Sequence, residues 1–302
     1  MEISLALGGG GSRGYAHIGV IRRLEKEGFL IRAVAGTSAG GIVAALYAAG
    51  FSPDEMESHF AELDQSKLFS ISLSEGPGLL SISYVTQLLE KYLGERDSET
   101  LKIPCALVAV DIRSHREVIL TKGRVVDAIL ATIAIPGIFA PKILGEYELV
   151  DGAVLNPVPV TIARSLMKYL PVVAVVLSPE MQAPANFVHI PLPVKIPTPI
   201  VERLTRLRLA HAFQIFEQSV DLGQRMITAL RLEVDDPEVI IRPEVAMIGI
   251  LDKTDIGAVV ALGEKAVEAV LPDLRRETSW SRRMGRGILT PRRGRRREIP
   301  AQ

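Results

Sequence analysis

Residues 2–28 read EISLALGGGGSRGYAHIGVIRRLEKEG, a strand pattern joined by glycines to a helix pattern. The apolar run Glu2–Leu7 predicts a buried strand, and the helical spacing of apolar side chains predicts a helix over Tyr15–Glu27. The segment Gly8–Gly14 links them in a tight turn, and the helix is expected to end at Gly28. This strand–turn–helix order is typical of α/β proteins.

The same order repeats directly afterwards. Leu30–Ala35 predicts a second strand, GTSAG at Gly36–Gly40 a second tight turn, and Gly41–Ala49 a second helix. Later apolar runs predict strands at Cys105–Val110, Tyr147–Val150, Val172–Leu177 and Val239–Ile241, and a closing helix over Asp255–Val270 that ends at Pro272. Alternating strands and helices indicate a mostly parallel sheet covered on both faces.

Length and composition allow a large core. The chain has 302 residues, of which 48% are hydrophobic and 5% aromatic, so one or two domains are expected. Cys105 is the only cysteine, which excludes a disulfide within the chain and argues against a cysteine-based zinc site. Its place in an apolar run predicts a buried structural thiol.

Charge is unevenly distributed, although the formal net charge is zero. From Arg275 onward there are ten Arg and two Glu, a balance of +8 that leaves −8 on the remainder. We expect this tail to be solvated and disordered. Contact with anionic lipid or nucleic acid is the alternative.

Nothing in the sequence predicts a leader or a membrane span. Met1 leads into the first predicted strand without a basic segment, and no apolar run reaches the ~18 residues that a spanning helix needs. We therefore expect a cytoplasmic protein, with peripheral membrane contact as a further option. The irregular segments Phe69–Ser81 and Met181–Pro199 are candidates for the substrate entrance or a membrane face, unless both simply pack on the body.

The glycine loop has three interpretations. Gly9, Gly11 and Gly14 match a dinucleotide-binding spacing, but no acidic residue follows at the end of the second strand to hold a ribose. A phosphate-binding P-loop would end in Gly-Lys-Ser/Thr, whereas this loop has Arg13-Gly14-Tyr15. The third interpretation is an oxyanion hole, because consecutive glycines allow backbone N–H groups to converge at a helix N-terminus.

Ser38 lies at the centre of GTSAG, between a predicted strand and a predicted helix. In a nucleophile elbow, Gly36 and Gly40 would relieve crowding beside the sharp turn that exposes the serine hydroxyl. The alternative is that Ser38 only caps the helix. The neighbouring glycine loop favours the nucleophile, because the two segments together supply the nucleophile and the amide donors of an acyl-transfer site.

A serine hydroxyl needs a base to become a good nucleophile. Asp151 follows the strand predicted at Tyr147–Val150, and a carboxylate acts as a base when apolar surroundings raise its pKa. The alternative is a plain Asp–Gly turn. No histidine is as well placed, and only the first of them is expected near the site, in a supporting position; they are His17, His59, His115, His189 and His211.

Three motifs in this order, GGGGSRGYAHIGV, GTSAG and DGA, resemble those of the patatin-like phospholipases. The bacterial members similar to the catalytic domain of neuropathy target esterase look closest. ATIAIPGIFAP at Ala131–Pro141 also resembles the block that precedes the Asp in that family. The resemblance is strong through Pro157, weaker to Pro272, and does not cover the tail from Arg275.

This resemblance implies a three-layer α/β/α sandwich around a mainly parallel sheet. It assigns residues 1–273 to one acyl hydrolase domain and residues 274–302 to the Arg-rich tail. The expected activity is hydrolysis of lipid esters, and the expected partner is the lipid ester itself, with no nucleic acid. A non-catalytic lipid or acyl binder on the same fold is the alternative. No metal and no cofactor are implied.

The resemblance also implies a Ser–Asp dyad in place of a triad. Ser38 matches the nucleophile and Asp151 the base, within the Asp motif that includes Gly152 and Ala153. Arg13 matches a basic residue that stabilises the loop or engages phosphate. Gly10 and Gly11 match the main oxyanion donors, within a loop that comprises Gly9, Gly10, Gly11, Ser12, Arg13 and Gly14.

Overall fold

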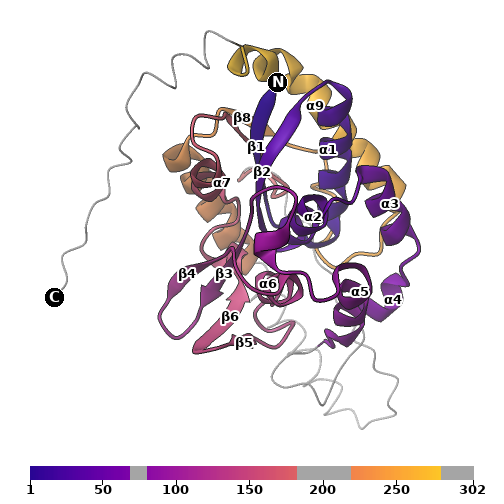
Figure 1. Ribbon diagram of the computed structural model, residues 1–302, viewed down its shortest axis with the longest axis vertical. Coiled ribbons are helices and arrows are strands. Elements are labelled where there is room, and N and C mark those ends of the chain that lie inside the picture. Colours follow the sequence, from indigo (N-terminus) through magenta and orange to yellow (C-terminus); the bar gives the residue numbers. More distant parts are fainter. Residues whose placement is uncertain (69–79, 182–218, 280–302) are drawn as a thin grey trace, which may run out of the picture.

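The computed structural model describes residues 1–68, 80–181 and 219–279, which form one sheet with helices on both faces (Figure 1). The strands run in the order β5-β6-β3-β2-β1-β7-β8, with β4 also paired to β3. The pairs among β3, β2, β1, β7 and β8 are parallel, and those of β4, β5 and β6 are antiparallel. The expected mainly parallel α/β/α sandwich is therefore confirmed. The bounds are β1 Glu2–Leu7, β2 Leu30–Thr37, β3 Cys105–Asp111, β4 Arg116–Leu120, β5 Lys142–Leu144, β6 Tyr147–Asp151, β7 Val172–Val175 and β8 Val239–Ile241.

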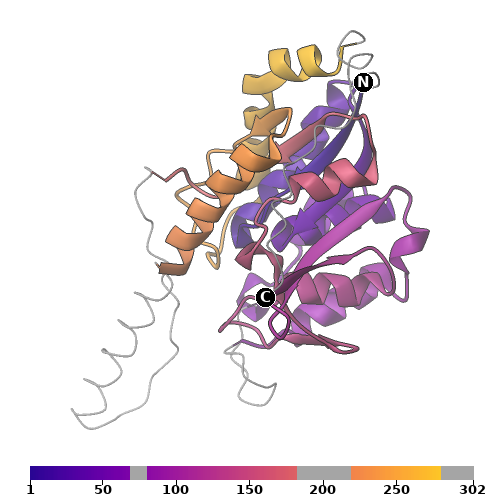
Figure 2. The same cartoon turned by 90° about the vertical axis from the view of Figure 1, so that its left-hand side faces the viewer.

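The helices divide between the two faces of the sheet. One face is covered by α1 (Ala16–Lys26), α2 (Ala39–Ala49), α3 (Pro53–Ala61), α5 (Ser83–Leu93), α6 (Val125–Thr132) and α9 (Ile256–Glu277), with the short α4 (Gln65–Leu68) beside α5. The opposite face is covered by α7 (Val160–Leu166) and by helical residues 219–235. Figure 1 shows α7 and α1 on opposite sides of β1 and β2, and Figure 2 shows residues 219–235, in orange, along the outside.

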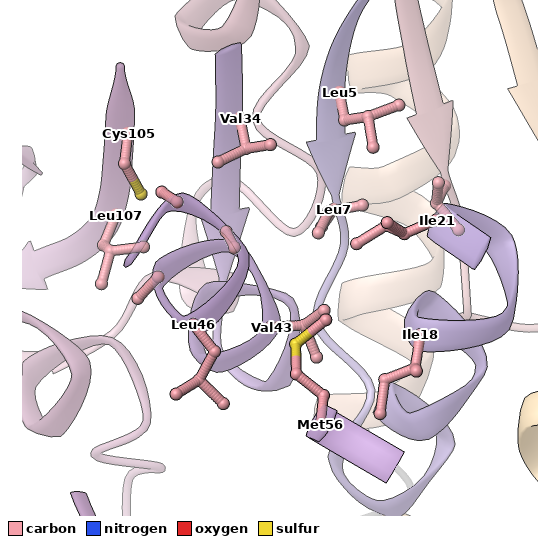
Figure 3. Packing of buried hydrophobic residues seen from close by; sticks show 14 of the residues in the cluster. Leu5, Leu7, Ile18, Ile21, Val34, Val43, Leu46, Met56, Cys105 and Leu107 are labelled. Carbon is pink, nitrogen blue, oxygen red and sulfur yellow. The ribbon is translucent and has the colours of Figure 1, made fainter. Parts of the chain in front are cut away.

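The two faces of the sheet carry side chains of different size. Leu5 and Leu7 of β1 pack toward Ile18 and Ile21 of α1 in the larger apolar cluster (Figure 3). Successive strand residues point to opposite faces, so the residues between these large side chains serve the other layer. There they are mostly alanines, which allow α7 to approach closely: Ala6, Ala35, Ala106 and Ala174.

Local signals in the sequence account for several helix ends, including the predicted one at Gly28. Gly28 (φ 82°) and Gly50 (φ 100°) follow α1 and α2 in the left-handed region, where glycine is favoured. Ser52 begins α3 with a capping box: its hydroxyl accepts from the Glu55 N–H at 3.2 Å, and the Glu55 carboxylate accepts from the Ser52 N–H at 2.8 Å. The strands predicted from apolar runs are also present.

Helices α1 and α9 cross at two glycines. A Cβ added to Gly19 would lie 1.9 Å from the carbonyl oxygen of Val260, and one added to Gly263 would lie 2.0 Å from that of Ala16. No side chain fits at either position, so the two backbones are in direct contact. Ion pairs flank the crossing, including Arg23 to Glu268 at 2.7 Å.

The predicted end of the closing helix at Pro272 is wrong, because α9 continues through this residue to Glu277. A proline inside a helix removes one backbone hydrogen bond. Here the following turn is held by other contacts: Leu274 is fully buried, and Arg275 pairs with Glu27 at 2.9 Å. The helix thus crosses the boundary expected between domain and tail.

Most of the two irregular segments lies outside the described residues. Phe69–Ser81 is described only at its last two residues, and Met181–Pro199 only at its first. The Arg-rich tail is described to Ser279. Their expected roles therefore stay predictions.

Gly263→Ala is expected to lower the free energy of unfolding by about 1–3 kcal/mol, because the added methyl group overlaps a carbonyl of α1 and forces the helices apart. Gly223→Ala is the matched control. Gly223 also lies within a helix, and nothing lies within 4 Å of its Cβ position, so this change should raise the free energy by about 0.5–1 kcal/mol. Urea unfolding followed by circular dichroism measures both; stabilisation by both would contradict the close crossing.

Candidate active site

Two strands meet end to end along one side of β3. On this side, β2 pairs with the first part of β3 and ends with Thr37 opposite Val108, while β6 approaches from the other direction and ends with Asp151 opposite Ala109. Val108 and Ala109 are consecutive residues, so the two strand ends lie next to each other. Ser38 follows Thr37 directly, and the structure therefore brings Ser38 and Asp151 together.

Ser38 occupies a strained turn between β2 and α2. Its φ of 55° and ψ of −127° are unusual for a residue with a side chain, as expected of a nucleophile elbow. A Cβ on Gly36 would lie 2.4 Å from the Gly40 carbonyl oxygen, and one on Gly40 would lie 2.3 Å from the Leu7 carbonyl oxygen. Both positions therefore require glycine, because the backbones approach too closely for a side chain.

Thr132 fixes the turn at Ser38 through two hydrogen bonds. Its Oγ1 accepts a hydrogen bond from the Ser38 N–H at 2.9 Å and donates one to the Val108 carbonyl at 2.5 Å. Thr132 has no exposed surface. This residue links α6, β3 and the elbow, and no role was predicted for it; its place in the Ala131–Pro141 block was the one available signal.

Asp151 is a buried carboxyl group, and no cationic side chain in the described part of the chain pairs with it. It is 3% exposed, and its Oδ1 accepts from the Ala153 N–H at 2.8 Å. Burial raises the pKa of Asp151 to about 6, although the neighbouring Ser38 hydroxyl and the Ala153 N–H act in the opposite direction. Gly152 permits the close passage past β3, since a Cβ there would lie 2.3 Å from the Val108 oxygen.

The glycine loop lies beside both residues. A Cβ on Gly9 would lie 3.3 Å from that of Ser38 and 3.5 Å from that of Ala153. The Gly9 N–H donates to the Pro157 carbonyl at 3.0 Å, whereas within the described part of the chain no acceptor is recorded for the amides of Gly10 and Gly11. These two amides are therefore the ones available to a ligand.

The rest of the loop is held by the segment after β8. The Ser12 N–H donates to the Ile250 carbonyl at 2.9 Å, and Arg13 Nε donates to the Ile248 carbonyl at 2.6 Å. Arg13 is 4% exposed, and burial lowers the pKa of its guanidinium. Gly14 passes close to α2, because a Cβ there would lie 2.6 Å from that of Ala39. No role was predicted for Ile248 and Ile250, which hold the loop through their backbone carbonyls.

His17 supports the loop and does not contact the two candidate residues. Its Nε2 lies 2.7 Å from the Gly8 carbonyl oxygen, and burial lowers its pKa to about 4, so the ring is neutral and donates to that oxygen. None of the three histidines in the described ranges, His17, His59 and His115, is recorded as a hydrogen-bond partner of Ser38 or Asp151. His189 and His211 lie outside those ranges.

An apolar cavity of about 170 Å³ opens beside Ser38. Ile42 and Leu46 of α2 form one wall, and the rest of the lining combines aliphatic and aromatic side chains from other segments. Three of these rings cluster: the His59 ring lies 4.3 Å from that of Tyr92 and 5.8 Å from that of Phe51. A cavity of this composition suits an alkyl chain better than a polar ligand.

The described ranges hold neither a metal-binding cluster nor a membrane-spanning helix. There, no group of three or more His, Cys, Asp or Glu side chains has an arrangement suited to a metal ion. No helix in these ranges is both long enough and apolar enough to cross a bilayer. Cys105 is buried, and burial raises the pKa of its thiol to about 12.

Several known proteins are similar in sequence to this chain. An uncharacterised NTE family protein of Mycobacterium tuberculosis is 38% identical over 161 residues, which is 52% of this chain and 44% of that protein. A second such protein of the same organism is 30% identical over 283 residues, 90% of this chain and 47% of that protein. The lysophospholipase NTE1 of Mycosarcoma maydis is 34% identical over 174 residues, 55% of this chain and 9% of that protein. The chain spans less than half the length of these relatives.

The fold is also similar to that of a solved structure, and the sequence matches the model of a protein family. VipD from Legionella pneumophila has a similar structure, with a TM-score of 0.55 at 13% identity over 89% of this chain and 66% of that one; the likeness concerns the fold alone. The family model described as patatin-like phospholipase matches residues 5–164. These residues are more than half of the chain and include the glycine loop, Ser38 and Asp151. The chain therefore belongs to the patatin-like phospholipase family.

Proposed function

We propose that the protein is a serine acyl hydrolase that cleaves carboxylic esters of lipids with Ser38 as nucleophile and Asp151 as base. The observation that carries this proposal is the position of Ser38 beside Asp151 where β2 and β6 end against consecutive residues of β3, together with the burial that raises the pKa of the Asp151 carboxyl group to about 6. Such a carboxylate is ionised at neutral pH and still has a higher proton affinity than an exposed Asp.

The two residues would act in two successive steps. Ser38 Oγ attacks the ester carbonyl carbon while its proton passes to Asp151, and collapse of the tetrahedral intermediate releases the alcohol, which takes up this proton. Water then attacks the acyl-enzyme, giving its proton to Asp151, and the second collapse releases the fatty acid and restores the Ser38 hydroxyl. One carboxylate serves both steps, because it returns to its ionised form after each.

The amides of Gly10 and Gly11 are the proposed oxyanion donors. They are the loop amides without a recorded acceptor in the described ranges, while their neighbours are engaged. Donors fixed in advance are effective because they need no reorganisation when charge develops on the carbonyl oxygen. His17 and Arg13 would contribute by fixing the loop, through the Gly8 and Ile248 carbonyls.

The apolar cavity supports a lipid ester as substrate. Because it begins at Ser38 and follows α2, an acyl chain bound there would place its ester carbonyl beside the nucleophile. The related NTE1 is named a lysophospholipase, which supports the same substrate class. A non-catalytic lipid binder would use the cavity as well, but it would not need a strained serine on a buried carboxylate.

Ser38→Ala is expected to lower ester hydrolysis by at least about a thousandfold, because the attacking oxygen is removed. Hydrolysis of p-nitrophenyl esters and labelling by a fluorophosphonate probe measure this loss. Ser58→Ala, at an exposed serine of α3, is the control and should retain both. Ester release that does not depend on Ser38 would contradict the assignment, and absence of any release in the native protein would favour the binder.

The dependence on pH should follow Asp151. Since the base must be ionised, kcat/KM is expected to rise with pH through a value near 6, where burial places the pKa of Asp151, and to level off above it. Asp151→Asn should remove this dependence together with at least about a thousandfold in rate. A pH–rate profile with a soluble ester measures it; a midpoint near 4 would contradict the role of a buried base.

The same substitution should stabilise the fold at high pH. Between its ordinary pKa of 3.8 and about 6, Asp151 holds a proton in the folded state that the unfolded state has released, so stability is lost as pH rises through this range. Asp151→Asn should therefore raise the melting temperature at pH 8 and not at pH 3.5. Asp111→Asn is the control, and it should lower the melting temperature at pH 8. Ser114 and backbone N–H groups lower the pKa of Asp111 to about 2, so its ionised form stabilises the folded state.

Leu46→Trp is expected to shorten the acyl chains that the enzyme accepts. Leu46 is eight residues after Ser38, about 12 Å along a helix, and an alkyl chain advances roughly 1.25 Å per carbon when its C–C bonds are ~1.5 Å. The added ring should therefore meet chains longer than about ten carbons and lower the kcat/KM ratio of dodecanoyl to butyryl esters roughly tenfold. Leu30→Trp, at an exposed position of β2, should leave the ratio unchanged; an unchanged ratio in Leu46→Trp would contradict the chain path.

A further inference from the structure

The helix at residues 219–235 has an apolar stripe on its outer side. Leu222, Met226, Leu230 and Val234 are 57%, 49%, 53% and 79% exposed. They are spaced by four residues, so they lie on one face of the helix, along about 18 Å of its length. Figure 2 shows this helix, in orange, at the outside of the molecule.

The inner side of the same helix carries Leu232, which packs in the smaller apolar cluster, but its other buried side chains are polar, in contrast to the usual arrangement. Arg225 is 6% exposed; its Nε pairs with Asp221 at 2.7 Å, and its Nη1 donates to the Glu180 carbonyl at 3.4 Å. One turn before the end, Arg231 Nε donates to the Leu155 carbonyl at 3.3 Å. Asp235 is 6% exposed as well. These contacts fix the rotation of the helix, so it cannot turn the stripe inward without breaking them.

The same helix is in electrostatic range of the glycine loop, because the charges of Asp221 and Arg225 act on the buried Arg13 guanidinium. The cavity beside Ser38 is lined from the opposite face of the sheet, by α2, α3 and α5.

We propose that this stripe docks the protein on a lipid surface, with the four side chains inserted at the level of the headgroups and upper acyl chains. The inference rests on the proposed function in one respect: the lipid ester that is hydrolysed would be part of such a surface. An apolar helix face lying in the plane of the interface is a known mode of shallow attachment. Since the stripe itself carries no charge, this attachment depends on apolar burial and not on anionic lipid.

A second copy of the chain fits the stripe less well. At about 100 Å² of apolar surface per side chain, the four partly exposed residues present on the order of 250 Å². A stable protein–protein interface needs roughly 800 Å² from each partner. A lipid surface has no such requirement, because shallow insertion of a few side chains contributes independently of a fitted partner surface.

Co-sedimentation with phosphatidylcholine vesicles tests the proposal. The full-length Ser38→Ala variant serves as parent, because it leaves the lipid intact and makes binding independent of turnover. Leu222→Gln/Met226→Gln/Leu230→Gln in this parent is expected to bind at least tenfold more weakly. The matched control changes three apolar residues with similar exposure elsewhere and should bind like the parent: Leu30→Gln, Ile119→Gln and Ile143→Gln.

The outcomes separate the alternatives. Binding by the parent that is lost in the stripe variant and unchanged in about 0.5 M salt supports the proposal. Equal binding by parent and stripe variant would overturn it, as would binding that salt abolishes. A parent dimer that the stripe variant dissociates, without vesicle binding, would overturn it in favour of a second copy. If the native protein did not hydrolyse esters, the proposed function would be refuted, and this binding result would be unaffected.

A second measurement does not rely on the folding of the triple variant. Cys105 is buried, and burial raises its pKa to about 12, so a thiol introduced by Leu230→Cys can be labelled selectively. An environment-sensitive fluorophore there should shift to the blue when vesicles are added, while the same label at Ile119→Cys should not. No shift at position 230, or an equal shift at both positions, would overturn the proposal.

Discussion

The structure depends on the sharing of one side of β3 by two other strands. β2 and β6 approach from opposite directions and end opposite Val108 and Ala109. A shift of the β6 register by a single residue would turn the Asp151 side chain to the other face of the sheet. The antiparallel strand β6 therefore has a role in the site, because it places the Asp151 carboxyl group beside the turn that follows the parallel strand β2.

The parts of the site that sequence could predict are those with local signals. Glycines between a strand and a helix marked the loop and the elbow, and an Asp at a strand end marked the third motif. The register that joins Ser38 to Asp151 across more than a hundred residues has no local signal. Thr132 acts through one hydroxyl, and Ile248 and Ile250 through backbone carbonyls, which any residue would supply. The end of α9 was predicted wrongly because Leu274 is held by tertiary burial, which overrides the local effect of Pro272.

Burial has opposite consequences for the titratable groups around the site. It raises the proton affinity of the Asp151 carboxylate and lowers that of the His17 imidazole, because a low-dielectric environment disfavours the charged form of each. The histidine is thereby kept neutral as a donor to the glycine loop, and the carboxyl group becomes more basic. A fold that buries an ionised carboxylate loses stability at neutral pH, which is a common feature of sites selected for reactivity.

The position of β1 has a consequence for synthesis of the chain on the ribosome. This strand emerges before β2 and β7, yet in the sheet it lies between them, and the helix that follows it, α1, packs against the much later α9. One edge of an apolar strand therefore stays without its partner until β7 has been synthesised. Unpaired edges of this kind template aggregation, so we expect the nascent chain to be prone to aggregation until that point.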